Sequence, residues 1–65
     1  MSKAKVNFQP CIIGHRAWFK NRMVALISKH GSVRYEIPEN EINSLPVYVI
    51  SAILIFAEDI ARNDI

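Results

Sequence analysis

The sequence predicts an α+β fold, in which a three- to four-stranded antiparallel β-meander is packed on one face by a single C-terminal α-helix. Two observations support it. Residues 46–62 form a long, mostly apolar segment without a turn signal, which favours a helix over a strand. Residues 5–37 contain short runs of alternating residue type separated by tight-turn signals, which is typical of strands. A chain of 65 residues makes one domain, so both parts share one core.

The helix is expected to span residues 46–62 and to pack on protein. Pro46 fits the first helical turn, because the N–H group that proline lacks would have no partner there. The apolar run extends from Pro46 to Ala57 and is interrupted only by Ser51. This run of about a dozen residues is too short to cross a bilayer, which takes about 20. A membrane span is therefore not expected.

The predicted helix has more apolar surface than one sheet can cover. Wound at about 100° per residue, it is apolar over about 220° of its circumference, whereas packing on one layer takes little more than about 100°. We therefore expect a flank that binds a second copy of the chain or a partner protein. The alternative is a few exposed aliphatic side chains of the ordinary kind. The candidate helix interface consists of Val47, Ile50, Leu54, Ile55 and Ala61.

The β-meander depends first on a two-residue turn at His30-Gly31, where glycine supplies the positive φ that such turns require. This turn sets Leu26 opposite Tyr35. One face of the hairpin is then apolar, and a slip of one residue would mix the two faces. The predicted apolar face contains Val24, Leu26, Val33, Tyr35 and Ile37, and the predicted outer face contains Ala25, Ile27, Lys29, Arg34 and Glu36.

A second tight turn, at Asn21-Arg22, extends the meander toward the N-terminus. It sets Phe19 opposite Val24 and adds Phe19 and Ala17 to the apolar face. Because side chains alternate along a strand, Arg16, Trp18 and Lys20 join the outer face. Agreement between two turns on one apolar face is the main support for the meander.

The two ends of the meander are predicted to be less regular. Gly14-His15 is a candidate third turn. Pro10 has no N–H group to donate, so it fits only an edge strand, and the first strand is expected to be short or interrupted. Residues 38–43 are expected to form a short turn before the helix.

The net charge of +2 conceals an asymmetry along the chain. Residues 1–35 contain seven lysine and arginine residues and no acid, which sums to +7. Residues 36–65 contain six acidic residues and one arginine, which sums to −5. Such a split favours a polyanionic partner on one side, or head-to-tail attraction between copies. The alternative is an ordinary solvated surface, because surface charge affects association more than fold.

The outer face of the predicted sheet combines cations with a tryptophan. Lysine and arginine release counterions from phosphates, and tryptophan stacks on bases, so the combination suits nucleic acid. The alternative is a solvated face whose basic residues keep the sheet edges soluble. The candidate binding face consists of Arg16, Trp18, Lys20, Lys29 and Arg34.

No catalytic or cofactor motif is present, so we predict a protein that is not an enzyme and carries no cofactor. Ser28, His30 and Ser32 share one hairpin tip, but a nucleophile also needs a base that a third group orients. A metal needs three or four ligands, and Cys11, His15 and His30 are the only soft candidates, so no metal site is expected, and His15 and Cys11 are interpreted as a turn histidine and a packed thiol. A single cysteine fits a reducing compartment, and the N-terminus lacks a signal-peptide pattern, so a cytoplasmic location is predicted.

These features predict a small non-enzymatic binding protein that acts as an inhibitor, adaptor or regulator by contact with another protein, of the kind found in phages and mobile elements. The alternative is a nucleic-acid-binding regulator that uses the basic, tryptophan-bearing outer face. So small a core buries little surface. We therefore also expect a homodimer, or a host protein partner, through the C-terminal helix.

Overall fold

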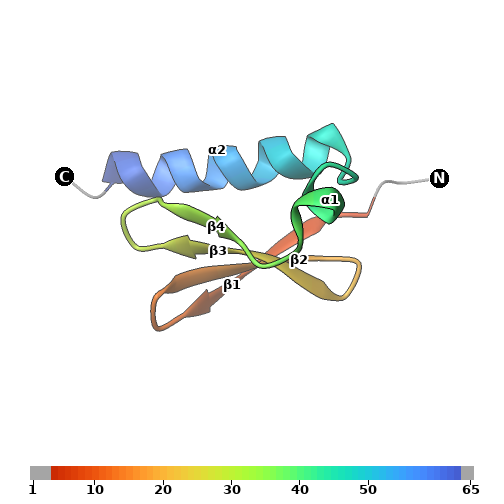
Figure 1. Cartoon of the computed structure of the whole chain (residues 1–65). Coiled ribbons are helices and arrows are strands. Elements are labelled where there is room, and N and C mark those ends of the chain that lie inside the picture. Colours follow the sequence, from red (N-terminus) through yellow and green to blue (C-terminus); the bar gives the residue numbers. More distant parts are fainter. Residues whose placement is uncertain (1–3, 64–65) are drawn as a thin grey trace.

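The computed structural model describes residues 4–63, and it confirms the predicted α+β fold. Four antiparallel strands form one sheet in the order β1-β2-β3-β4, and a long helix packs against it. Figure 1 shows this helix running along one face of the sheet. The elements are β1 Val6–Cys11, β2 Gly14–Phe19, β3 Arg22–Ser28, β4 Val33–Tyr35, α1 Glu39–Ile42 and α2 Val47–Asn63.

The core forms where α2 crosses the two central strands. Val49, Ile53 and Ala57 are buried, and their spacing of four residues places them on one side of the helix. Ala17 of β2 pairs with Ala25 of β3, and both are fully buried. Their small side chains leave room for the helix to approach the sheet. The buried core consists of Ala17, Phe19, Val24, Ala25, Ile27, Val49, Ile53 and Ala57.

The predicted register of the β3–β4 hairpin is wrong by one residue. Tyr35 pairs with Ala25, and Leu26 pairs with Arg34. The reason is a longer loop than the predicted two-residue turn, because β3 ends at Ser28 and β4 begins only at Val33. The slip exchanges the two faces of β3, since side chains alternate along a strand. Ala25 and Ile27 are therefore buried in the core, and Leu26 moves to the outer face.

The side chain of Ser28 organises this longer loop. Its Oγ accepts hydrogen bonds from the backbone N–H groups of His30 at 3.2 Å and Ser32 at 3.0 Å. The backbone N–H of Ser28 also donates to the carbonyl of Ser32 at 2.8 Å. Serine and threonine commonly stabilise turns in this way. The serine cluster at the hairpin tip thus has a structural role in the loop.

The β2–β3 turn also lies one residue earlier than predicted. Lys20 and Asn21 form it, with φ angles of 52° and 62°, and Phe19 pairs with Arg22. Two positive φ angles in succession match the twist of a two-residue hairpin. The register then shifts between Ala17 and Trp18, where β3 has one extra residue. This bulge places Val24 in the core beside Ala25, so Val24 is buried as predicted. The predicted pairing of Val24 with Phe19 is wrong, because Phe19 pairs with Arg22.

The first strand is more regular than the sequence suggests. β1 has six residues and continues through Pro10, which pairs with His15 of β2. Its edge position in the sheet agrees with the missing N–H group of proline. The turn that follows is Ile12-Ile13 and not Gly14-His15, because Cys11 pairs with Gly14.

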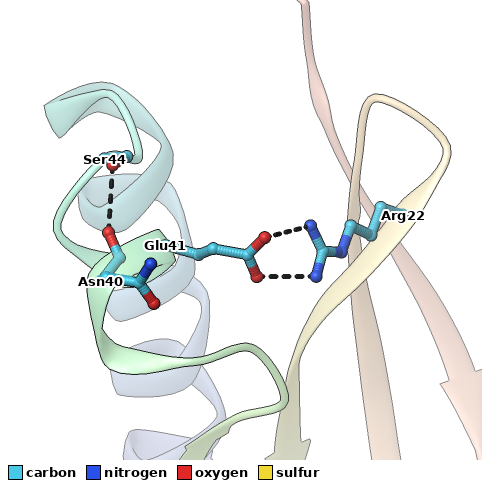
Figure 2. A network of polar contacts seen from close by, with 4 residues as sticks. All are labelled: Arg22, Asn40, Glu41 and Ser44. Atoms are coloured by element: carbon cyan, nitrogen blue, oxygen red, sulfur yellow. Dashed lines mark hydrogen bonds and ion pairs between the residues drawn. The ribbon is translucent and has the colours of Figure 1, made fainter.

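The short helix α1 is joined to the sheet by an ion pair that Figure 2 shows. The guanidinium of Arg22 donates two hydrogen bonds to the carboxylate of Glu41, at 2.8 and 2.6 Å. These hydrogen bonds, together with the negative charge of Glu41, raise the pKa of Arg22 above its ordinary value. Close by, the hydroxyl of Ser44 donates to the carbonyl of Asn40 at 3.0 Å. The residues after β4 are thereby held beside the β2–β3 turn.

Replacing Glu41 with glutamine is expected to lower the midpoint of urea denaturation slightly. The amide can keep one hydrogen bond with Arg22 but loses the charge attraction, and exposed ion pairs contribute little. The pKa of Arg22 is higher in the folded protein than in the unfolded chain. The stabilisation from the charge of Arg22 is therefore complete below the pKa of the unfolded chain and is lost as the pH rises through the pKa of the folded protein. It should not vary near neutral pH. High salt should reduce the difference from wild type.

The matched control for this prediction is Glu39→Gln on the same short helix, because Glu39 forms no ion pair among the described residues. Glu39→Gln should leave the midpoint close to that of wild type. An effect of Glu41→Gln that is equally large at high salt would contradict an electrostatic origin.

Candidate functional site

The sheet has one face under α2, and the opposite face, here named the outer face, is covered by no other described element (Figure 1). The register identifies which residues lie on it. Arg16 pairs with Leu26, and Leu26 pairs with Arg34, so these three side chains form a row across β2, β3 and β4. Trp18 lies on the same face as Arg16, because the residue between them, Ala17, is buried under α2.

The other two predicted binding-face residues lie elsewhere. Lys20 is in the β2–β3 turn, where its Nζ is 5.4 Å from the centroid of the buried Phe19 ring, and so it reaches toward the α1 side of the sheet. Lys29 is in the β3–β4 loop, and its backbone N–H donates to the carbonyl of Ile13 at 3.1 Å. The predicted residues that share the outer face are Arg16, Trp18 and Arg34.

Beside Trp18 lies a hollow with a volume of about 340 Å³, which was not predicted from the sequence. Asn7, Gln9 and Asn21 line it together with Trp18 and part of Phe8. The signal that could have found it is the alternation in β1, where Val6 and Phe8 are apolar and the residues after each are amides. We name this site the amide hollow. Its residues are Asn7, Gln9, Trp18 and Asn21.

The charge asymmetry of the sequence becomes an asymmetry between layers. Lys5 precedes β1, and the other cations of residues 4–35 belong to the strands and their connections. The two helices contain four acids, Glu39, Glu41, Glu58 and Asp59, against one cation, Arg62. On the outer face, the Nε of Arg34 lies 3.3 Å from a carboxylate oxygen of Glu36. Within residues 4–63, no ion pair is formed by Arg16. The outer face is therefore basic, and the helical layer is acidic.

A second surface lies along α2. Val47, Leu54 and Ile55 have exposed fractions of 81%, 51% and 60%, which are high for aliphatic side chains. Ile50 is half-buried, and Ala61 is exposed but close to Gly31 of the β3–β4 loop. All five predicted helix-interface residues therefore have side chains at or near the surface. We name the surface formed by Val47, Ile50, Leu54 and Ile55 the aliphatic flank.

The aliphatic flank is distinct from the side of α2 that faces β1. On that side the ring of Phe56 stacks on Phe8, with ring centroids 3.9 Å apart. It also packs edge-to-face with the ring of His15, with centroids 4.8 Å apart. At the C-terminal end of α2, Glu58 accepts a hydrogen bond from Arg62. Glu58, Asp59 and Arg62 are exposed beyond Ile55, so this border of the flank is charged, with one negative charge in excess.

Two further isoleucines are exposed at the β1–β2 turn. Ile12 has an exposed fraction of 91%, and Ile13 is also exposed. Turns usually contain glycine, proline, asparagine or aspartate, so the position of these side chains could not be predicted from residue type. The neighbouring Cys11 is a free, half-buried cysteine.

Within residues 4–63, no helix is both long and apolar enough to cross a membrane. In the same part of the chain, no three histidine, cysteine or acidic side chains are close enough together to hold a metal ion. No family model matches the sequence, and the comparisons with curated proteins and with solved structures found no match.

Proposed function

We propose that this chain is a small non-enzymatic binding protein, an inhibitor, adaptor or regulator, that acts by contact with a partner protein through the aliphatic flank of α2. The observation that carries the proposal is the exposure of Val47, Leu54 and Ile55 on one helix. Burying an aliphatic side chain that is half exposed contributes about 1 kcal/mol, so three of them offer a useful part of a binding free energy.

The fold itself does not need these side chains. Val49, Ile53 and Ala57 already bury the inner side of α2 against the sheet. At an exposed helix position, lysine or glutamate has a better helix propensity than valine or isoleucine. Ile55, in the interior of α2, therefore favours an additional packing partner over helix stability alone.

The border of the flank indicates the chemistry of the partner. Glu58 and Asp59 are exposed next to it, and the helical layer as a whole is acidic. A partner surface with an apolar groove and a basic rim complements this arrangement. A second copy of the chain is the other possible occupant of the flank, and the same variant tests both. With its one free cysteine, Cys11, the chain suits a reducing compartment, and we propose the cytoplasm.

Replacing Leu54 with glutamate is expected to weaken partner binding at least about tenfold, because a charge would be buried against an apolar surface. The partner would be isolated on the wild-type protein from an extract of the native host, purified, and titrated against each variant. Asn40→Glu adds the same charge at an exposed position of α1 and should bind like wild type. Circular dichroism would establish that both variants are folded.

Light scattering separates the two possible occupants. A mass that exceeds the 7.4 kDa monomer and falls to it in Leu54→Glu would identify a second copy of the chain. A wild type that stays at 7.4 kDa when concentrated, together with a purified partner that binds Leu54→Glu and wild type equally, would reject the aliphatic flank as the interface.

A further inference from the structure

We propose that the outer face of the sheet binds single-stranded nucleic acid, with one base stacked on Trp18 in the amide hollow and the adjoining phosphates contacted by Arg16 and Arg34. This site lies on the face of the sheet opposite α2, so it is separate from the aliphatic flank. It does not depend on the function proposed for that flank.

The amide hollow has the composition that base recognition requires. Trp18 is half-buried, so its ring is supported by the sheet while one part stays accessible. Indole rings stack on bases of any sequence. Each side-chain amide of Asn7, Gln9 and Asn21 offers both a donor and an acceptor, which matches the edges of unpaired bases. Among the described residues, no hydrogen bond engages these three amides. The volume of about 340 Å³ lies at the small end of ligand sites.

The cations lie where the backbone of a bound strand would pass. Arg16 and Trp18 are two residues apart on β2, which places their side chains on one face about 7 Å apart. Gln9 pairs directly with Arg16, so the amide hollow and the arginine row are continuous. The described residues place one acid on this side, Glu36, which pairs with Arg34 and offsets one of the two positive charges, so the excess positive charge of the face comes from Arg16. The outer face is therefore complementary in charge to a phosphate backbone.

The width of the sheet favours a single strand over a duplex. Four strands have three spacings of about 4.8 Å, so the face is about 14 Å wide before side chains are added. The major groove is only about 12 Å wide and admits a helix or a two-stranded ribbon. In addition, a base can stack on Trp18 only if it is free of its own helix. The first constraint disfavours insertion of the whole sheet into the major groove, and the second requires an unpaired base at Trp18, so both favour a single strand.

The experiment uses the fact that Trp18 is the only tryptophan, so tryptophan emission reports this site alone. The full-length protein would be titrated at low salt with a 12-nucleotide single-stranded DNA, the corresponding RNA, and a duplex of the same sequence. Saturable quenching by a single-stranded probe is the expected result, with the duplex weaker. The DNA and RNA titrations identify the preferred sugar.

Variants test the named contacts by fluorescence anisotropy of a labelled oligonucleotide. Trp18→Leu is expected to weaken binding about tenfold or more, since stacking on an aromatic contributes on that scale. Arg16→Gln should weaken binding and reduce the slope of log affinity against log salt by about 0.7. Gln9→Ala changes an exposed side chain, so it should leave the fold intact while weakening binding. Arg62→Gln removes the same charge from α2 and should have no effect.

Several results would overturn the proposal. One is unchanged tryptophan emission with both single-stranded probes at low salt. Another is that wild type and Trp18→Leu bind the oligonucleotide with equal affinity and that a heparin fragment binds as tightly as the oligonucleotide. That pattern would indicate a non-specific cationic patch. Tighter binding of the duplex would also reject it. None of these outcomes bears on the aliphatic flank, whose test is binding by Leu54→Glu.

Discussion

Replacing Gly14 with alanine is expected to unfold the protein or to leave it barely stable. A Cβ atom at this position would lie 2.0 Å from the carbonyl oxygen of Ile27 and 2.8 Å from the carbonyl carbon of Ser28. Both are backbone atoms of β3, which cannot rotate away as a side chain can. The φ angle of Gly14 is +146°, which side chains of L-residues rarely permit. The substitution therefore combines steric overlap with backbone strain.

The expected loss is about 3 kcal/mol or more, because strain and overlap each cost roughly 1–3 kcal/mol. The total free energy of unfolding of a chain of this length is roughly 3–10 kcal/mol. Urea denaturation followed by circular dichroism would measure the loss. Ile13→Ala, at the exposed neighbouring position, is the control and should change stability by no more than about 0.5 kcal/mol. A wild-type midpoint for Gly14→Ala would mean that the start of β2 does not meet β3 as described.

The sequence was sufficient to predict the architecture because its two patterns are long and independent. The apolar run before Glu58 exceeds any ordinary strand, so α2 was predictable from length alone. The alternation in β2, where Ala17 and Phe19 are buried and Arg16 and Trp18 face outward, was also visible. These local patterns do not depend on which strand pairs with which residue.

The register was not predictable for reasons that are local and steric. The bulge at Val24 adds one residue to β3, and no residue type announces it. The predicted meander placed Leu26 in the core, whereas the observed one buries Ala25 and Ile27. Serine at position 28 can end a strand or continue it, and only its hydrogen bonds to the following loop decide which.

The candidate site was predictable to the same extent as the strands that carry it. Arg16 and Trp18 follow from the alternation in β2, and Arg34 is on the outer face as predicted even though its partner is Leu26. Lys20 was placed on the outer face by continuing the alternation one residue too far. It lies in a turn at φ 52°, where the rule of alternating faces ends.

Replacing Ile53 with alanine is expected to cost about 2–5 kcal/mol, the usual range for truncating a buried isoleucine. Ile53 has an exposed fraction of 0% and lies in the middle of α2, above the central strands. Ala17 and Ala25 are too small to move into the space that the truncation would leave. The cavity would therefore persist, and in so small a core it would remove a large fraction of the total stability.

Ile55→Ala is the matched control, because it makes the same change two residues further along the same helix. Ile55 has an exposed fraction of 60%, so its truncation loses little burial, and alanine has the better helix propensity. The free energy of unfolding of the monomer should therefore change by less than about 0.5 kcal/mol. Urea denaturation of both variants at two protein concentrations would measure these losses. Equal losses that do not depend on concentration would mean that α2 packs on the sheet through a different side. A loss for Ile55→Ala that grows with concentration would instead show that the aliphatic flank is buried between two copies of the chain.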